Sequence, residues 1–457
     1  MWPCIIIALA LRLLLYSVDL TEVPEFVTPL SSMHRIQEGI SLARSGVSPY
    51  SGHAFHQPPL ILALLWPFFD HKGSTPRYAG LPLQLLFFIA DVLVAYMLRT
   101  IMLRKLLRDA RLTANTLEPK RDQYFLPSWL RDAAALPNIC AAAYLLHPFA
   151  LCSNVAWDVS SLVRVATVGS VYFATTSRST LACICLALSC YVEIHPIIFV
   201  VATSALEMSE SRSKERELKA YLVVLCRQMS IVVGVWFVLQ ACTWYVLHFY
   251  PFFHLDENQQ HVNLMNFTMR EAFQSSYVWH LTAQDYTPNV GIHWYLFSML
   301  FERFRPYFTF AFNIQLFVYV APLVVRVRGR PLILLTVLTS LVALLRPYPT
   351  LGDFSLPSVL MLMHPHVVAR MRQKSVLVVS TSIGVALLPT MWYLWLYPGA
   401  ACANHYYFSQ LTYTTSLLLV VSEFLGAALL RDRQIEETEA EVLELALQAL
   451  EIKKGTD

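Results

Sequence analysis

Residues 80–112 read GLPLQLLFFIADVLVAYMLRTIMLRKLLRDARL, and this stretch decides how the chain is arranged. Residues 80–102 are almost entirely apolar, whereas residues 103–131 carry seven Lys or Arg residues. A helix needs about 20 apolar residues to cross the hydrocarbon of a bilayer, because each residue adds only about 1.5 Å. An apolar run of that length, followed at once by a basic segment, predicts a membrane span that ends on the cytoplasmic side.

Three further basic stretches repeat the pattern. Residues 209–227 hold five Lys or Arg residues, and the short segments 326–330 and 369–374 are also basic. Basic loops stay on the cytoplasmic side, so the apolar spans between them must alternate in direction. The sequence therefore predicts a multi-pass membrane protein whose long, uncharged loops face the opposite compartment.

The composition agrees with a membrane location. Of the 457 residues, 56% are hydrophobic and 14% are charged, and the mean hydropathy is +0.49. Soluble domains carry about 25% charged residues, so this chain has too little charge to cover a water-facing surface. Its basic residues flank membrane spans, which favours contact with lipid phosphates and argues against a nucleic-acid partner. Most of the nine cysteines lie within apolar spans, so no disulfide framework is expected.

Together these rules predict an all-α domain over residues 1–430 with about twelve spans, and both termini in the cytosol. The expected spans are 3–19, 80–102, 133–154, 158–177, 179–192, 194–208, 228–250, 307–325, 332–346, 354–368, 376–397 and 406–430. Residues 3–19 are interpreted as a retained signal anchor. The two long luminal loops are about 20–79 and 251–306. Within the first loop, the apolar run 58–69 is too short to cross and is expected to be re-entrant or interfacial.

The C-terminal segment 431–457 differs from the rest because it is acidic. Apolar residues from Val442 to Leu450 fall on one stripe of a short helix. The favoured interpretation is a solvated cytosolic helix that caps the domain. A helix that docks a partner is the alternative.

Catalytic residues are hard to find on the luminal side. Glu22 and Glu25 lie in the first loop, but no D-x-D pair is present. The second loop holds His254, Asp256, Glu257 and His261, whose spacing matches no usual metal frame, so a solvated loop is favoured. Signatures of acyl hydrolases, NTPases and dinucleotide enzymes are also absent, and no cofactor is expected. Asn266 begins an Asn-Phe-Thr sequon and is a glycosylation candidate.

Arginines that are expected to be buried lie inside two of the predicted spans. Arg12 falls in the first span and Arg164 in the fourth. A charge in the hydrocarbon costs about 2.5–3.5 kcal/mol on insertion scales, so each arginine must face protein, water or a lipid phosphate. For Arg164, a structural ion pair and a lipid-headgroup role remain equally open.

Four polar, proline-rich stretches are expected together on the luminal side. They are 48–52 with Tyr50, 285–295 with Asp285 and Asn289, 348–353 with Asp353, and 399–404 with Cys402 and Asn404. Prolines and glycines fix the shape of such loops, and small residues allow close approach. Composition alone favours an ordinary interfacial belt of aromatic residues. The alternative is that the four loops converge and grip a polar glycan while the spans hold its acyl chains.

The same stretches resemble the PIG-U family, a membrane subunit of the glycosylphosphatidylinositol (GPI) transamidase complex. The similarity runs in order from about residue 3 to residue 430. Its clearest matches are Pro29–Ser32, Glu38–Gly39, 46–52, 59–60, Leu281–Thr282, Asp285, Thr287–Gly291, Trp294–Tyr295, Phe301–Glu302, Asn313, 322–323, Tyr348–Thr350, Gly352–Asp353, Trp392, Leu394–Trp395, Tyr397, Gly399 and Asn404.

The resemblance implies a scaffold similar to that of GT-C mannosyltransferases, here without their luminal D-x-D. It also implies a non-catalytic subunit that binds GPI in the endoplasmic reticulum membrane. Expected partners are a cysteine-protease-like PIG-K type subunit, PIG-T and GPAA type subunits, GPI glycolipid and membrane lipids. Family asparagines that face the phosphoethanolamine correspond to Asn404 and, with a change of residue, to Cys402. The rival hypothesis is a dolichol-phosphate-mannose-dependent mannosyltransferase of GPI biosynthesis, using Glu22, Glu25, Asp256 or Glu257.

Overall fold

The computed structural model describes residues 2–45, 47–52, 54–69, 80–113, 134–210, 218–249, 269–282 and 285–454. Within these ranges the chain is helical and contains no strand. Five helices are long and apolar enough to cross a membrane: α4 (Gly80–Thr113), α11 (Leu218–Phe249), α15 (Arg305–Val327), α19 (Lys374–Leu396) and α20 (Ala403–Lys454). The bent pair α6 (Leu136–Leu145) and α7 (Pro148–Val155) makes a sixth candidate span.

Shorter helices account for the other predicted spans. They are α1 (Trp2–Leu15), α8 (Ser160–Thr175), α9 (Ser179–Val192), α10 (Val200–Glu210) after the 3-10 turn η3 (His195–Phe199), α16 (Pro331–Leu345), and α17 (Ser355–Leu362) with α18 (Pro365–Arg370). Each predicted span thus coincides with a helix or a helix pair. The structure supports an all-α membrane protein with five or six spans by length and composition, and the count of twelve stays a prediction.

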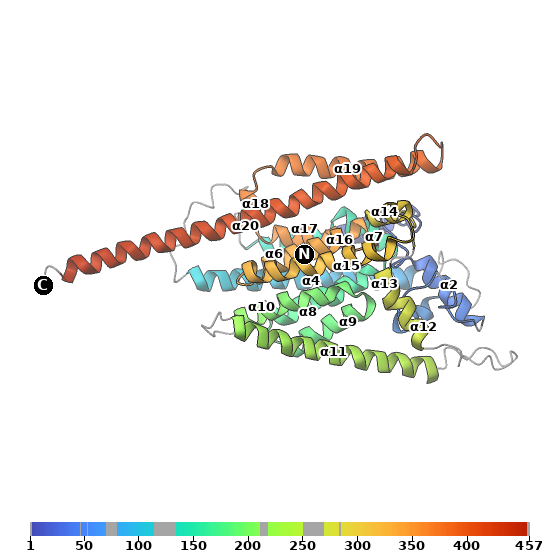
Figure 1. The fold of residues 1–457 in the computed structure, drawn as a ribbon, viewed down its shortest axis with the longest axis horizontal. Helices are drawn as coiled ribbons and strands as arrows, with labels where there is room; N and C mark the ends of the chain where they lie inside the picture. The colour runs from blue at the N-terminus through green and yellow to red at the C-terminus, as the bar shows by residue number, and fades with distance from the viewer. Residues whose placement is uncertain are drawn as a thin grey trace.

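The long helices run side by side, and the short helices of the two large loops gather at one end of the bundle (Figure 1). That end carries α2 (Met33–Arg44), α12 (Met269–Phe273), α13 (Trp279–Thr282) and α14 (His293–Met299), with the π-helical turn η6 (Gln274–Val278) between α12 and α13. The apolar run 58–69 forms only α3 (Pro59–Leu65) and the 3-10 turn η1 (Trp66–Phe68). A helix this short agrees with the prediction that the run does not cross.

The opposite end brings the basic stretches together. Arg108 from α4 donates to Ser209 Oγ of α10 at 2.8 Å, and Lys105 contacts His364 Nδ1 at 3.0 Å. Arg330, which follows α15, lies 2.6 Å from Asp432 of α20. The described parts of these basic stretches therefore lie on one side of the bundle, as the predicted alternation of spans requires.

A proline break between α6 and α7 places polar side chains inside the bundle. His147 precedes Pro148, has an extended backbone, and caps α7 by accepting a hydrogen bond from Phe149 N. Because proline disfavours a helical residue before it, the two helices meet at 42°. Arg12 of α1 lies in this region and pairs with Asp91 of α4 at 2.6 Å, both side chains being buried. Arg12 was expected to face protein, water or a lipid phosphate, and in the structure it faces protein.

Helix α20 joins the last predicted span to the acidic tail without a break. Its 52 residues correspond to about 78 Å, far more than the roughly 30 Å of hydrocarbon. In Figure 1 its C-terminal part extends well past the ends of its neighbours. The tail is helical, as predicted, but it continues the span instead of forming a separate helix. The domain boundary at 430 stays a prediction.

Candidate functional site

Three of the four polar stretches meet at the end of the bundle that carries the short helices. Tyr348 donates its hydroxyl to the carbonyl oxygen of Asp285 at 3.0 Å. Gly291 approaches Pro349 so closely that a Cβ atom would lie 2.6 Å from the proline Cδ. Tyr295 donates to Asn404 Oδ1. The segment 285–295 therefore contacts both 348–353 and 399–404, which is the convergence that the glycan-binding alternative requires.

Asn404 lies at the start of α20 with its side chain exposed. Because the tyrosine hydroxyl of Tyr295 binds the amide oxygen, the amide nitrogen is left as a donor toward solvent. The ring of Tyr295 stacks on Tyr407 with centroids 4.4 Å apart, and Trp294 packs beside it. The site thus offers one fixed amide donor next to half-buried aromatic faces, a combination suited to a sugar-phosphate.

Asn289 supports this surface from beneath and is fully buried. Its Oδ1 accepts the backbone N–H of Gly291 at 2.7 Å, and its carbonyl accepts from the side chain of Gln410. Gln410 also accepts from the indole of Trp294 at 2.9 Å. Asn289 therefore shapes the loop before α14, the helix that carries Tyr295, and its role in binding lipid stays a prediction.

Asp285 forms an ion pair that joins the two large loops. Its carboxylate lies 2.8 Å from Arg35 of α2, and Oδ1 accepts the backbone N–H of Thr287 at 2.8 Å. Burial would raise the pKa of Asp285, but the Thr287 hydrogen bonds and the Arg35 guanidinium together outweigh it and lower the pKa. The carboxylate is therefore ionised and already occupied by protein partners.

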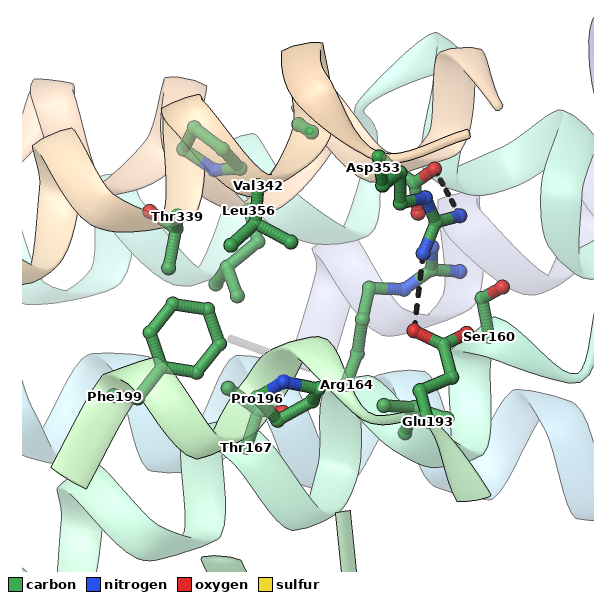
Figure 2. Close-up of a pocket in the computed structure, with 14 residues that line it drawn as sticks. Ser160, Arg164, Thr167, Glu193, Pro196, Phe199, Thr339, Val342, Asp353 and Leu356 are labelled. Atoms are coloured by element: carbon green, nitrogen blue, oxygen red, sulfur yellow. Dashed lines mark hydrogen bonds and ion pairs between the residues drawn. The ribbon is translucent and has the colours of Figure 1, made fainter. Parts of the chain in front are cut away.

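Asp353 lies at a small cavity inside the bundle, shown in Figure 2. It pairs with Arg346, which also lies 3.1 Å from Glu193. The cavity has a volume of about 60 Å³ and is further lined by Ser160 and Arg164 of α8. Its charged end lies where α8 begins and α9 and α16 end, close to the converging loops.

The remaining predicted residues have separate environments. Tyr50 is buried, and its hydroxyl donates to the carbonyl of Gln57 at 2.9 Å, so it braces the first loop. Cys402 is exposed, with its sulfur 3.2 Å from His405 Nδ1. Asn266, His254, Asp256, Glu257 and His261 lie outside the described residues. No metal-binding group of three or more His, Cys, Asp or Glu occurs in the residues that the structure describes.

Glu25 is a buried carboxylate of the first large loop. It is buried, Tyr406 donates to its Oε1 at 3.2 Å, and Oε2 has no partner among the described residues. Burial raises the pKa of Glu25 to about 7. Its backbone carbonyl accepts from Leu351 N at 2.8 Å, which ties the first loop to 348–353. The side chain is enclosed by protein.

Sequence reasoning missed several residues of the site. Tyr295 was predicted only as a member of the polar stretch 285–295. The sequence did not point to Tyr407, Gln410, Glu193 or Arg346 as candidate site residues. Glu193 and Arg346 are the charged residues that end α9 and follow α16, and charged residues at the ends of apolar spans are a usable signal. Tyr407 and Gln410 give no such signal, because aromatic and amide residues are common near helix ends at membrane interfaces.

Comparisons with known proteins show which proteins the chain resembles in sequence. A family model described as GPI transamidase subunit PIG-U matches residues 4–413. The chain is 27% identical to the GPI-anchor transamidase component PIGU of Homo sapiens, over 94% of this chain and 93% of the relative. It is 25% identical to the GPI transamidase component GAB1 homolog of Schizosaccharomyces pombe, over 89% and 87%. A GPI mannosyltransferase 1 of Dictyostelium discoideum is 29% identical, but over only 34% of this chain and 29% of the relative.

Proposed function

The chain belongs to the PIG-U family, and on that premise we propose that it is a GPI transamidase subunit that binds the GPI lipid without catalysing its transfer. It would act in the endoplasmic reticulum membrane beside PIG-K, PIG-T and GPAA type subunits. A GT-C-like scaffold with twelve spans, both termini cytosolic, is part of the same proposal. The observation that carries the lipid-binding role is the Asn404–Tyr295–Tyr407 surface at the converging loops.

That surface fits recognition better than chemistry. Asn404 presents a neutral donor that can bind a phosphate oxygen, and the neighbouring aromatic rings can pack against sugar faces. Asp285 and Asp353 are held by Arg35 and Arg346, so neither carboxylate is poised to act as a base. They would instead fix the loops around the ligand. Tyr50, Asn289 and Cys402 would support the same loops.

The first experiment replaces Asn404. Asn404→Ala removes the donor, and Asn404→Asp keeps the size but places a carboxylate against the lipid phosphate. Both variants are expected to lower GPI attachment to a reporter protein by about tenfold, because hydrogen bonds to charged groups contribute about 1.5–3 kcal/mol. Surface display of the reporter in cells that lack the native chain is the measurement.

Matched variants separate recognition from folding. Tyr295→Phe keeps the ring but releases the Asn404 amide, so a smaller loss is expected. Asn313→Ala removes an amide of α15 that donates to the Leu281 carbonyl, and it should leave display unchanged. Full display by Asn404→Ala and Asn404→Asp at normal protein levels would exclude Asn404 as a contact.

A mannosyltransferase is the second candidate, favoured by the partial match to a GPI mannosyltransferase. The two functions differ in the lipid that builds up when the chain is missing. Loss of a transamidase subunit leaves complete GPI unused, whereas loss of a transferase leaves a precursor that lacks a mannose. Mass analysis of GPI lipids from depleted cells therefore decides between them.

A further inference from the structure

The turn between α7 and α8 carries a carboxyl group that is completely buried. Asp158 is 0% exposed, and its Oδ1 accepts the backbone N–H of Ser160 at 3.1 Å. Its Oδ2 has no hydrogen-bond partner among the described residues. Asp158 also forms no direct ion pair within the part of the chain that the structure describes. An ionised carboxyl group in this position would lose its hydration without gaining a cation or a full set of donors.

The other charged groups at this end of the bundle already balance one another. Arg346 pairs with Asp353 and lies 3.1 Å from Glu193. Figure 2 shows Arg164, the second guanidinium, on the same side of the cavity as Glu193 and Asp353. Two cations and two carboxylates therefore sum to zero.

An ionised Asp158 would add one negative charge to this neutral set. Its carboxyl group acts electrostatically on Arg164 and lies near Asp353. It also acts on Glu193 and Arg346. Two cations would then face three carboxylates in an enclosed site, which is costly because water does not screen the excess charge there. One bound proton restores neutrality.

Asp158 is the carboxyl group that holds this proton at the lowest cost. Glu193 and Asp353 share a guanidinium partner, and Asp91 is paired with Arg12. Protonation of any of these three carboxylates would weaken an ion pair. Protonation of Asp158 removes only the uncompensated charge.

The Asp158 turn also joins two of the segments that lead to the loop surface. The backbone N–H of the next residue donates to the Ser31 carbonyl of the first loop at 3.3 Å. One turn further along α8, Arg164 donates to the Gly352 carbonyl at 3.3 Å. A negative charge on Asp158 would repel the Asp353 carboxylate beside that carbonyl. The charge state of Asp158 therefore bears on both contacts.

We propose that Asp158 is neutral in the folded protein and acts as a positioning residue that holds the first loop and the segment 348–353 together. Release of its proton to water would leave a third carboxylate beside Asp353 and loosen the loops behind the Asn404 surface. The effect on GPI attachment rests on the function proposed above, whereas the protonation state does not.

Infrared spectroscopy of the purified full-length chain in detergent tests the protonation state. A protonated carboxyl group has a carbonyl stretching band that is distinct from the bands of a carboxylate. At neutral pH, the wild-type spectrum minus that of Asp158→Asn should show one such band, and heavy water should shift it. Glu25 holds a proton in part at this pH, but it is present in both proteins and cancels in the difference.

Unfolding midpoints of two variants give an independent test. Asparagine has the shape of a protonated aspartic acid and keeps an oxygen that can accept the Ser160 N–H. Asp158→Asn should therefore keep the wild-type midpoint and normal display of the reporter. Asp353→Asn removes a carboxylate that pairs with Arg346, so it should lower the midpoint.

The dependence on pH separates a bound proton from a merely structural role. In a Glu25→Gln background, the folded chain that retains Asp158 holds one proton more tightly than the unfolded chain. Its midpoint should therefore fall as the pH rises and Asp158 ionises. The double variant Glu25→Gln/Asp158→Asn should fall less, because its amide cannot ionise.

Three results would overturn the proposal. They are a difference spectrum without a carbonyl band, a loss of stability in Asp158→Asn equal to that in Asp353→Asn, and failure of Asp158→Asn to fold. Each would mean that Asp158 is ionised and serves as a counter-charge for Arg164. A carbonyl band in a chain whose Asn404→Ala variant displays the reporter normally would keep the proton and exclude only the function of the loop surface.

Discussion

Gly352 allows the loop before α17 to lie directly on α7. A Cβ atom at this position would lie 2.0 Å from Ser153 Oγ and 2.9 Å from Ser153 Cβ. The carbonyl of Gly352 also binds Arg164, so this close approach helps to hold the charged end of the cavity. This turn requires glycine because no Cβ atom fits at position 352, and amino-acid composition does not reveal such a requirement.

Gly352→Ala is therefore expected to lower the free energy of unfolding by about 1–3 kcal/mol, as for other overpacked sites. Gly426→Ala in α20 is the matched control, because no atom lies within 4 Å of its added Cβ. That substitution should be neutral or stabilising, since alanine favours helix. Chemical or thermal unfolding in detergent measures both, and equal midpoints for the two variants would contradict the packing argument.

Glu25 makes stability depend on pH. Burial raises its pKa from about 4.5 to about 7, so the folded state holds this proton more tightly than the unfolded state. Its stabilising contribution is complete below pH 4.5 and is lost as pH rises through 7, a difference of up to about 3 kcal/mol. The unfolding midpoint should fall between about pH 5 and pH 8, and it should fall less in Glu25→Gln. Parallel pH profiles for the two proteins would disprove the shift.

At the level of single residues, the sequence did not predict which distant side chains pair with one another. A buried arginine needs a partner, so the sequence predicted that Arg12 would have one. It did not identify Asp91 as that partner. Arg35 and Asp285 are 250 positions apart, and Tyr295 and Asn404 are 109 apart. Neither pair has a local pattern that selects it. Asn404 belongs to one of the four polar stretches, but only the resemblance gave it a specific role in contacting GPI, because an asparagine near a helix start usually has a local role.

At the scale of elements, the Arg12–Asp91 pair holds α1 to α4. Asn154 of α7 donates to the same Asp91 carboxylate at 2.8 Å, and Tyr144 of α6 donates to its other oxygen at 3.2 Å. One carboxylate therefore joins four helices. The α6–α7 break is part of this arrangement because it places Asn154 against α4.

Removing one partner leaves the other charge buried and unpaired. Arg12→Met or Asp91→Leu alone should cost about 3–5 kcal/mol, whereas the double variant should cost clearly less than the sum. Unfolding of the four proteins of this double-mutant cycle gives the coupling free energy. Additive losses would mean that the pair contributes no interaction of its own.

Helix positions were predictable where apolar runs are long, as in α4, α11, α15 and α19. The number of spans was not. Helices α9, α10 and α16 have 14, 11 and 15 residues, each shorter than a bilayer-spanning helix. Their residues are largely buried among neighbouring helices, so hydropathy records packing inside the bundle as well as contact with lipid. Length and composition therefore leave these segments undecided.

At the scale of the whole molecule, the basic stretches and the polar turns lie at opposite ends of the helix bundle. The basic stretches meet through Arg108, Lys105 and Arg330, and the polar turns meet through Asp285, Gly291 and Asn404. The helix bundle separates the two groups (Figure 1). The positive-inside rule assigns the basic end to the cytosol. On this rule we expect the loop surface to face the lumen.

Two exposed positions test this orientation in sealed microsomes. Cys402 marks the loop end, and Gly329→Cys marks the basic end, where an added side chain meets no atom within 4 Å. With Cys226 and Cys242 changed to serine, a membrane-impermeant maleimide should label the thiol introduced by Gly329→Cys in intact vesicles, and Cys402 only after permeabilisation. The predicted spans alternate in direction, so on that prediction one reversed label would mean that every loop is reversed. Labelling of Cys402 in intact vesicles would therefore place the Asn404 surface in the cytosol and exclude it as a luminal GPI site.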